Sequence, residues 1–278
     1  GGYDGPANTN DIDYFEIMTL GDALDFGDLT RARRYPTSVA SPTRVVTTGG
    51  TGDSYPSTEV GDRMTDIFTI SSKGNAIDFG DLTQARLQCS ANNDTIRGVW
   101  SGGTGPGHSS HNIMDYVTIS NTANALDFGD IGKAKNCLAS CSSTTRGFVQ
   151  HANNPTSPVG VFNTFIIRTT GNTTEFGDTL HFQTVYGGAS NATRGIFAGS
   201  YSSPAQEGTN TIEFVTIASQ GDSVDFGADM ATKHRSGHSA SSSTRGVFGG
   251  GFDGSDRTNL IDYITIASTG DSKDFGDL

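Results

Sequence analysis

Cysteine is scarce in this chain, which has only three, Cys89, Cys137 and Cys141, among 278 residues. On a single strand Cys137 and Cys141 would lie ~13 Å apart at ~3.3 Å per residue, which is too far for a disulfide. The sequence therefore provides no disulfide framework. We expect the three cysteines to be small buried residues.

Long apolar runs are absent as well, because none approaches the ~20 residues of a membrane helix and no signal segment opens the chain. Positive charge is limited, with 18 Lys and Arg against 30 Asp and Glu, a formal net charge of −12. Phosphate backbones and anionic membranes select for clustered Lys and Arg. We therefore expect no nucleic-acid partner and no membrane insertion. The chain has no initiator Met, so we expect a processed product or part of a longer polypeptide.

What the chain does have is a repeat. Phe-Gly recurs at intervals of 53, 49, 48, 50 and 49 residues, at Phe26, Phe79, Phe128, Phe176, Phe226 and Phe275. Twelve residues before each Phe stand Tyr14, Ile67, Tyr116, Thr164, Phe214 and Tyr263. Nine before it is always an Ile: Ile17, Ile70, Ile119, Ile167, Ile217 and Ile266. An Arg follows the first five by 18 or 19 residues: Arg44, Arg97, Arg146, Arg194 and Arg245. A period near fifty along the whole chain predicts a repeat architecture.

Each unit contains four strand candidates, separated by Gly, Asn and Asp. They are a small-residue run before the Arg, a short run after it, an alternating run such as 262–266, and the run ending in Asp-Phe-Gly-Asp. Gly followed by Asn or Asp between the third and fourth runs supplies the positive φ of a tight hairpin turn. With no helical pattern, the sequence predicts an all-β fold, a β-propeller with about six blades of four antiparallel strands.

The repeat boundaries define one propeller domain, 1–278, with units at 1–28 (partial), 29–81, 82–130, 131–178, 179–229 and 230–278. Strands three and four occur six times, but strands one and two only five times. We therefore predict that the blade containing Tyr14 to Asp28 is incomplete, its missing strands coming from the flank of a longer polypeptide or from a neighbour. The Ile series should face the neighbouring blade. The residues five before each Arg should lie innermost: Val39, Asn92, Cys141, Ala189 and Ala240.

Strand two ending in Gly-Gly, a variable loop, and Leu-Thr-x-Ala-Arg from Leu82 to Arg86 resemble the kelch repeat over essentially the whole chain. The chain departs from that repeat in having Phe for Trp on strand four, His151-Ala152 for one glycine pair and Thr164 for a Tyr. The motifs Thr-Arg-Gly-Val-Phe-Gly-Gly-Gly and Asp-Phe-Gly-Asp-Leu together resemble repeats of virion and tail-fibre-like proteins of marine cyanophages. This second resemblance implies a virion setting.

Acids paired at a spacing of three recur with the Phe: Asp25 and Asp28, Asp78 and Asp81, Asp127 and Asp130, Glu175 and Asp178, Asp274 and Asp277. They could ligate calcium, which prefers several carboxylate oxygens. Alternatively they accept backbone N–H bonds in turns or pair with the repeated Arg. We favour the structural alternative, because a function seldom needs so many copies of one site, and we interpret the Arg series as an ion-pairing or turn-stabilising group.

No catalytic constellation emerges, since no Ser or Cys has the setting of a nucleophile and the histidines are scattered. His108 and His111 lie in a Gly-rich loop with too few neighbouring ligands for zinc, so we expect exposed loop histidines. The sequence therefore predicts a protein that is not an enzyme and holds no metal or cofactor.

Connections of an antiparallel meander alternate between its two ends, and here most length variation falls between strands two and three. The longest such connection runs from Thr51 to Met64. Variable loops on a regular scaffold commonly carry recognition. The candidate binding residues are Asp53, Tyr55, Glu59, Asp62, His108 and His111.

We expect a non-enzymatic structural protein of a phage virion or appendage, whose propeller contacts other virion proteins or a host-surface glycan or protein. Its location would be the virion, and it could form a homo-oligomer. The alternatives are a cellular kelch-type adaptor or surface adhesin, secreted or at the cell surface, and a propeller enzyme acting on polysaccharide.

Overall fold

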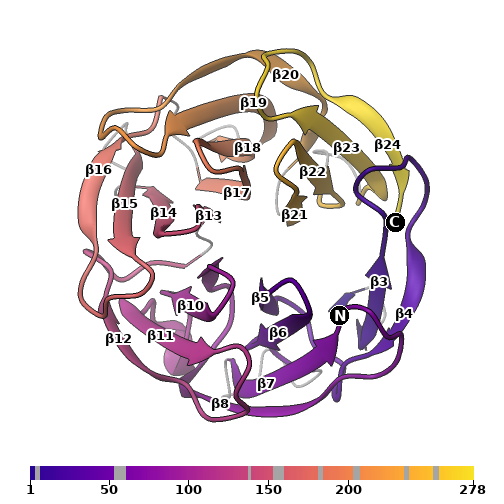
Figure 1. Cartoon of the computed structure of the whole chain (residues 1–278), viewed down its shortest axis with the longest axis vertical. Helices are drawn as coiled ribbons and strands as arrows, with labels where there is room; N and C mark the ends of the chain where they lie inside the picture. Colours follow the sequence, from indigo (N-terminus) through magenta and orange to yellow (C-terminus); the bar gives the residue numbers. More distant parts are fainter. Residues whose placement is uncertain are drawn as a thin grey trace. The chain divides into compact units, whose positions relative to one another are not determined.

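The structure, a computed structural model, describes residues 1–3, 7–52, 61–136, 139–152, 160–180, 184–202, 207–234, 238–252 and 257–278. These residues form an all-β propeller of five four-stranded antiparallel blades and two small sheets (Figure 1). The only helix among them is the short 3₁₀ segment η1 (Pro106–His108).

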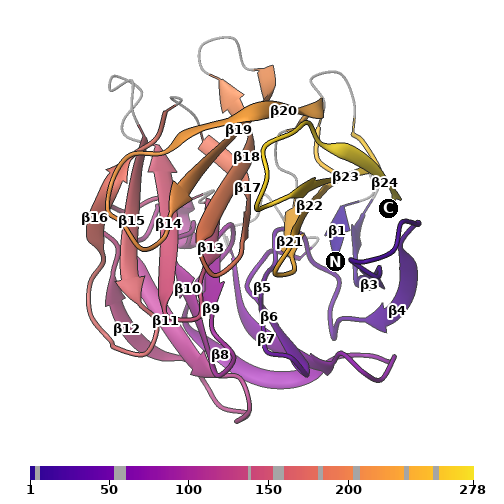
Figure 2. The same cartoon turned by 45° about the horizontal axis from the view of Figure 1, so that its top comes forward.

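Each blade follows the chain order of its four strands, as can be traced for β13–β16 in Figure 2. The first two blades are β5 (Thr37–Ala40), β6 (Arg44–Thr48), β7 (Asp62–Thr69), β8 (Ile77–Arg86), and β9 (Ser90–Asn93), β10 (Arg97–Ser101), β11 (Ile113–Thr118), β12 (Leu126–Asp130). The next two are β13 (Ala139–Ser142), β14 (Arg146–Ala152), β15 (Gly160–Ile166), β16 (Thr174–Asp178), and β17 (Thr184–Ser190), β18 (Arg194–Ser202), β19 (Glu207–Thr216), β20 (Val224–His234). The last is β21 (His238–Ser241), β22 (Arg245–Gly249), β23 (Leu260–Thr265), β24 (Lys273–Asp277).

The small sheets are β1 (Gly2–Tyr3) with β2 (Asn8–Thr9), and β3 (Asp11–Tyr14) with β4 (Leu24–Asp28). β3 and β4 are strands three and four of the first repeat. Within the described residues this sheet has no strands one and two. The five predicted complete blades are therefore confirmed, whereas the interpretation of the β3–β4 sheet as a sixth, incomplete blade stays a prediction.

The chain forms two compact units that alternate along the sequence. Unit 1 contains residues 1–14, 24–137 and 165–174, and unit 2 contains residues 15–23, 138–164 and 175–278. Each unit has its own clusters of buried side chains. The assignment of 1–278 to one domain stays a prediction.

The Phe of the repeated Phe-Gly is the extra residue of a β-bulge. In the last blade Ile261 pairs with Gly276 and Asp262 with Asp274, so that Phe275 has no partner across the ladder. The same shift occurs opposite Phe26, Phe79 and Phe128. A bulge re-aims a side chain, and these four Phe side chains are buried. The repeat thus keeps Phe because the bulge directs it into the core.

Phe128 illustrates how the aromatic residues pack. Its ring lies edge-on to Tyr116 of its own blade, with centroids 6.0 Å apart, and edge-on to Phe165 at 5.2 Å. Pairs with the residue twelve earlier recur for Phe26, Phe226 and Phe275 at 6.0 to 6.1 Å. The twelve-residue spacing in the sequence is therefore a cross-strand aromatic contact.

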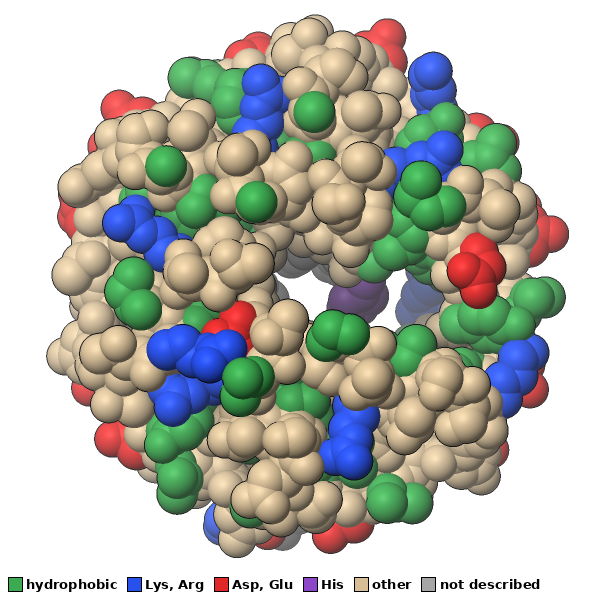
Figure 3. Space-filling view, viewed as in Figure 1, with side chains coloured by type: hydrophobic (Ala, Val, Ile, Leu, Met, Phe, Trp, Pro, Cys, Tyr) green, Lys and Arg blue, Asp and Glu red, His purple; other side chains and the backbone are tan. Residues whose placement is uncertain are grey.

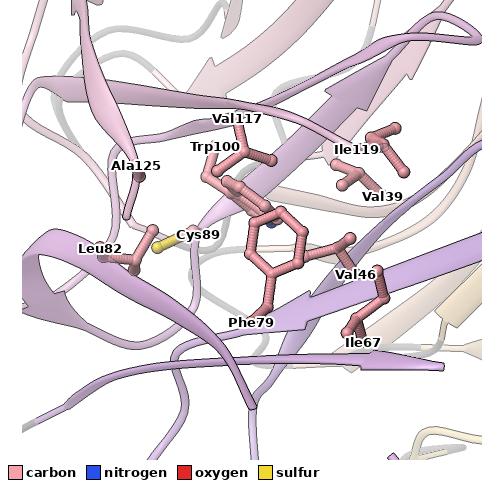
Figure 4. Close-up of a cluster of buried hydrophobic side chains, with 10 residues drawn as sticks. All are labelled: Val39, Val46, Ile67, Phe79, Leu82, Cys89, Trp100, Val117, Ile119 and Ala125. Atoms are coloured by element: carbon pink, nitrogen blue, oxygen red, sulfur yellow. The ribbon is translucent and has the colours of Figure 1, made fainter. Parts of the chain in front are cut away.

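The cluster in Figure 4 shows that unit 1 buries its apolar side chains between blades. Val46, Ile67 and Phe79 come from the β5–β8 blade, whereas Trp100 and Val117 come from β9–β12. The indole of Trp100 is fully buried and its Nε1 donates to Thr37 O on β5 at 3.3 Å. Blade-to-blade packing is therefore the source of the core in this unit.

The predicted inward position of the Ile series holds for four of its six members. Ile119, Ile167, Ile217 and Ile266 are at most 4% exposed. Ile17 is partly buried, and Ile70 is 44% exposed, so the prediction is wrong for Ile70.

The innermost strand-one residues pack against glycines of the next repeat. A Cβ on Gly98 would meet Val39 Cγ2 at 2.4 Å, and a Cβ on Gly246 would meet the Ala189 Cβ at 2.9 Å. Val39, Asn92, Cys141 and Ala189 are buried as predicted. Ala240 is exposed, which corrects the prediction for that residue. The strand two that would follow it in the repeat order belongs to the first repeat, where it is absent from the described residues.

Candidate functional site

The two ends of the blades differ in how much of their surface the scaffold itself uses. One end carries the connections from strand one to two and from three to four, and we call it the short-hairpin end. The other carries the connections from strand two to three and from four to one, and we call it the long-connection end.

At the short-hairpin end, the turn after strand three stacks on strand four of the preceding repeat. Asn124 Oδ1 accepts the Asp81 N–H at 3.0 Å, and a Cβ on Gly80 would lie 2.7 Å from Ala123 O. Equivalent Asn or Asp side chains accept the N–H of Asp28, Asp130, Asp178, Asp229 and Asp277. The turn Asn or Asp is thus an inter-repeat acceptor, and the Gly of Phe-Gly permits the close approach.

The repeated Arg also belongs to this end. Arg97 lies over the Tyr116 ring at 4.3 Å, and its Nη1 donates to Ile167 O at 3.2 Å. Each of the other four Arg donates to a carbonyl after strand three of another repeat, namely Ser120, Ile217, Ile266 and Ile17. The structural role predicted for this series is therefore confirmed, but its partners are carbonyls and aromatic rings and not the paired acids.

At the long-connection end of unit 1, backbone bonds tie the two kinds of connection together. Arg34 and Thr51 exchange N–H···O bonds of 3.0 and 2.9 Å, and Leu87 and Thr104 exchange bonds of 2.9 and 2.8 Å. The connections therefore share an end, as the meander predicts.

Buried ion pairs stabilise this end of the blades. Arg86 and Asp115 are both fully buried, 2.5 Å apart, and Arg86 also donates to the carbonyls of Gly102 and Ile113 at 2.8 Å. The Thr83 hydroxyl donates to the same carboxylate at 2.6 Å. Arg33 and Asp66 form an equivalent pair at 2.9 Å. The Leu-Thr-x-Ala-Arg motif thus fixes strand four to the third strand of the next repeat, a contact that no pattern within a single unit showed.

The connection from β10 to β11 is the longest one described completely. Thr104 forms bridges with Leu87 and Ser110, while the Asn136 side chain donates to the Thr104 hydroxyl at 2.7 Å. η1 forms the tip of this connection, and residues 106–110 are exposed. The connection is therefore an exposed loop whose base is held by hydrogen bonds.

The two predicted histidines of this connection differ. His108 is exposed, as expected, and has a positive φ of 59°. His111 is half-buried, so the expectation of an exposed histidine is wrong there: its imidazole packs where a Cβ on Gly105 would otherwise extend. Burial, and after it the charge of Arg86, lowers the pKa of His111. That imidazole is therefore neutral near pH 7 and belongs to the scaffold.

An aromatic–guanidinium cluster, which we call the Tyr–Arg–Tyr cluster, lies at this end and was missed by the sequence analysis. The Arg34 guanidinium carbon is 5.1 Å from the Tyr3 ring centroid and 5.6 Å from that of Tyr35. Tyr3 is 39% exposed and Tyr35 is 44% exposed. Tyr35 also has a φ of 61°, a conformation uncommon for a residue other than glycine. No repeated pattern in the sequence indicated this cluster, because the positions equivalent to Arg34 and Tyr35 hold unrelated residues such as Leu87 and Gln88.

No model of a known protein family matches the chain. No curated protein matches it either. The kelch and cyanophage resemblances remain predictions.

The other predicted binding residues are only partly placed. Asp53, Tyr55 and Glu59 lie outside the described residues. Asp62 is the first residue of β7 and not part of a free loop: its carboxylate pairs with Arg31 at 3.1 Å and accepts the Met64 N–H at 3.0 Å. We therefore correct Asp62 from a loop contact to a strand residue with intramolecular partners.

The remaining titratable groups form no dense cluster in the part of the chain described, where no three His, Cys, Asp or Glu residues gather as metal ligands would. Lys and Arg occur as separate small groups on the face in Figure 3. Neither Cys89 nor Cys141 is in a disulfide, both are buried as expected, and burial raises the pKa of both thiols. Cys137 lies outside the described residues. No helix within the described ranges is long and apolar enough to cross a membrane.

Proposed function

We propose that this protein is a non-enzymatic binding module that recognises its partner with the long-connection end. The observation that carries this proposal is the Tyr–Arg–Tyr cluster, defined by Tyr3, Arg34 and Tyr35. Tyr and Arg are the residues most enriched among energetically dominant contacts. Both Tyr residues are exposed, and their ring centroids lie 5.1 and 5.6 Å from the Arg34 guanidinium carbon.

The contrast between the two ends supports this assignment. The turns and arginines of the short-hairpin end are engaged in bonds between repeats, so that end repeats the same residues from blade to blade. The long-connection end combines variable sequence with a bonded base. A rigid base with variable projections is the common form of a recognition surface.

In its finer form, the proposal is that the repeats are of the kelch type and that the chain belongs to a phage virion or appendage. The partner is then another virion protein or a host-surface glycan or protein. The resemblance of the repeat sequence to kelch repeats and to repeats of cyanophage virion proteins supports this finer proposal. Detection of peptides from this chain by mass spectrometry of purified phage particles tests it.

Binding is tested with Tyr35→Asn, alone and with Tyr3→Ala. Asn removes the phenol ring and tolerates the positive φ of position 35. Met18→Ala is the matched control, because Met18 is 63% exposed in the connection between β3 and β4. We expect the Tyr variants to lose at least ~10-fold in affinity for intact host cells or virion proteins, and Met18→Ala to bind like the unmodified chain. Equal binding by all variants, or release of sugar from host polysaccharide by the purified chain, would contradict the proposal.

A further inference from the structure

The open edge of β3 differs from the third strand of every complete blade. Within the described residues β3 pairs only with β4, whereas β23 pairs with both β22 and β24. An unpaired strand edge presents free N–H and C=O groups that another strand can bind. In this fold the edge is an exception among six otherwise equivalent strands.

The equivalent strand-three positions of the complete blades are buried, which indicates that a further strand would cover this edge. Positions equivalent to Ile12 hold Thr65, Met114, Phe162, Ile212 and Ile261, all at most 1% exposed. Positions equivalent to Asp13 hold Asp66, Asp115, Asn163, Glu213 and Asp262, all at most 5% exposed. Ile12 itself is only partly buried and Asp13 is exposed. The side chains that are core elsewhere are thus left at the surface in this one sheet.

The backbone around Gly1 has the geometry of a blade whose second strand ends there. In the last blade Gly250 N donates to Leu260 O at 3.0 Å, and the Gly1 amine donates to Asp11 O at 2.5 Å. Gly1 and Asp11 stand in the repeat where Gly250 and Leu260 stand. The bonds of an antiparallel pair alternate, so the equivalent of Phe248 would lie opposite Asp13.

A cationic strand suits this edge electrostatically. In three of the complete blades the strand-two Arg lies over the strand-three ring, as Arg245 does over Tyr263 at 4.7 Å. At the incomplete sheet it is Lys73 that lies over the Tyr14 ring, at 4.5 Å. Asp11 and Asp13 add negative charge beside the edge, and partial burial followed by the charge of Asp11 raises the pKa of Asp13.

We propose that the β3 edge is a strand-addition site for a β-hairpin of the repeat's own kind. The hairpin would have a small-residue first strand and an Arg-Gly-aliphatic-aromatic second strand, and it would pair antiparallel to Asp11–Tyr14. Main-chain bonds supply the affinity of such an interaction and the alternate side chains supply its specificity.

The test adds a synthetic peptide with the sequence of residues 238–249, the hairpin of β21 and β22, to the intact chain. Hydrogen exchange of the amides of residues 11–14 is the measurement. We expect saturable slowing of exchange by at least ~10-fold. The control is the same peptide with Phe248→Pro, which lacks the N–H that would pair opposite Asp13 and should give no slowing.

A second measurement covers the case in which the free peptide is too weakly ordered to bind. The same twelve residues are fused directly before Gly1, with and without Phe248→Pro. The unmodified fusion should have the higher Tm and the slower exchange at residues 11–14. If neither peptide nor fusion differs from its proline control, the proposal is wrong. Protection of residues 11–14 that instead rises with the concentration of the chain alone would also overturn it, because the occupant would then be a second copy.

Discussion

At the scale of single residues, the repeated positions are explained by contacts between repeats. Phe128 contacts rings at 6.0 and 5.2 Å, and Arg97 combines a ring face with a carbonyl 70 residues away. The Phe128–Phe165 ring contact and the Arg97–Ile167 hydrogen bond each join different fifty-residue units, whereas the contacts of both residues with Tyr116 lie within one unit. The residues that recur most strictly are therefore those that join one unit to the next.

Ile266→Ala should lower the free energy of unfolding by ~2–5 kcal/mol, because it leaves a cavity at a fully buried side chain. Ile70→Ala is the matched control from the same series, since Ile70 is 44% exposed. It should cost under ~0.5 kcal/mol. Equilibrium denaturation of both variants checks this, and equal losses would show that position in the repeat, not burial, determines the cost.

Asp115→Asn should destabilise the protein by ~3–5 kcal/mol, because it leaves the buried Arg86 guanidinium without its counter-charge. The repeat offers its own control, since Lys135 and Asn163 stand at the positions of Arg86 and Asp115 in the next unit. The double variant Arg86→Lys with Asp115→Asn should therefore lose less than the two single variants together. Urea denaturation of the three variants measures the coupling; strict additivity would speak against the pair acting as a unit.

At the scale of elements, the bulged strand four and the following hairpin turn form one joint. Gly27, Gly80, Gly129 and Gly276 all have φ between 141° and 151°, and a Cβ on each would meet the next turn's backbone at 2.5 to 2.7 Å. The turn glycines have similar φ, but a Cβ on them would meet nothing within 4 Å. Ala123 replaces one turn glycine without a positive φ. The close approach, more than the turn itself, demands glycine.

Gly80→Ala and Gly74→Ala separate these two effects, because their φ angles are 144° and 143°. Gly74→Ala should cost ~1–2 kcal/mol from the backbone conformation alone. Gly80→Ala should cost ~1–3 kcal/mol more, because its Cβ would press on Ala123 O. Thermal unfolding measures both, and the same Tm for the two variants would refute the close-approach explanation.

At the scale of the whole molecule, the blades fold as a scaffold whose projections can vary. In the connection from β6 to β7, the hydrogen bonds that the structure describes are made by residues within 49–52 on one side and by residues from 61 onward on the other. A loop outside that base can change length at little thermodynamic cost, since each doubling of loop length costs about 0.6 kcal/mol.

Replacing residues 53–60 by a short Gly-Ser linker should therefore change the free energy of unfolding by less than ~1 kcal/mol. Asp62 is kept because it begins β7 and pairs with Arg31. The same variant should bind host cells or virion proteins more weakly, because it removes Asp53, Tyr55 and Glu59. A large loss of stability, or unchanged binding, would contradict the role predicted for this loop.

Local patterns were enough to predict the all-β architecture, the order of the strands within each blade and the five complete blades. The repeat period, the Gly, Asn and Asp residues between strands and the unequal number of strand copies can all be seen in the sequence. Such local patterns specify the secondary-structure elements and their order. They also correctly predicted that the repeated Arg is structural, and that Val39, Cys141 and Ala189 are buried.

The residues that meet across repeats could be identified only in the folded chain. The Arg86–Asp115 pair joins residues 29 apart, and the Tyr3–Arg34–Tyr35 cluster joins a terminal strand to the connection before β5. Ile70 and Ala240 kept the pattern of their series but not the burial, because burial depends on what the neighbouring repeat supplies. A repeat pattern shows that positions are equivalent, whereas the neighbour that each position receives is decided when the blades pack.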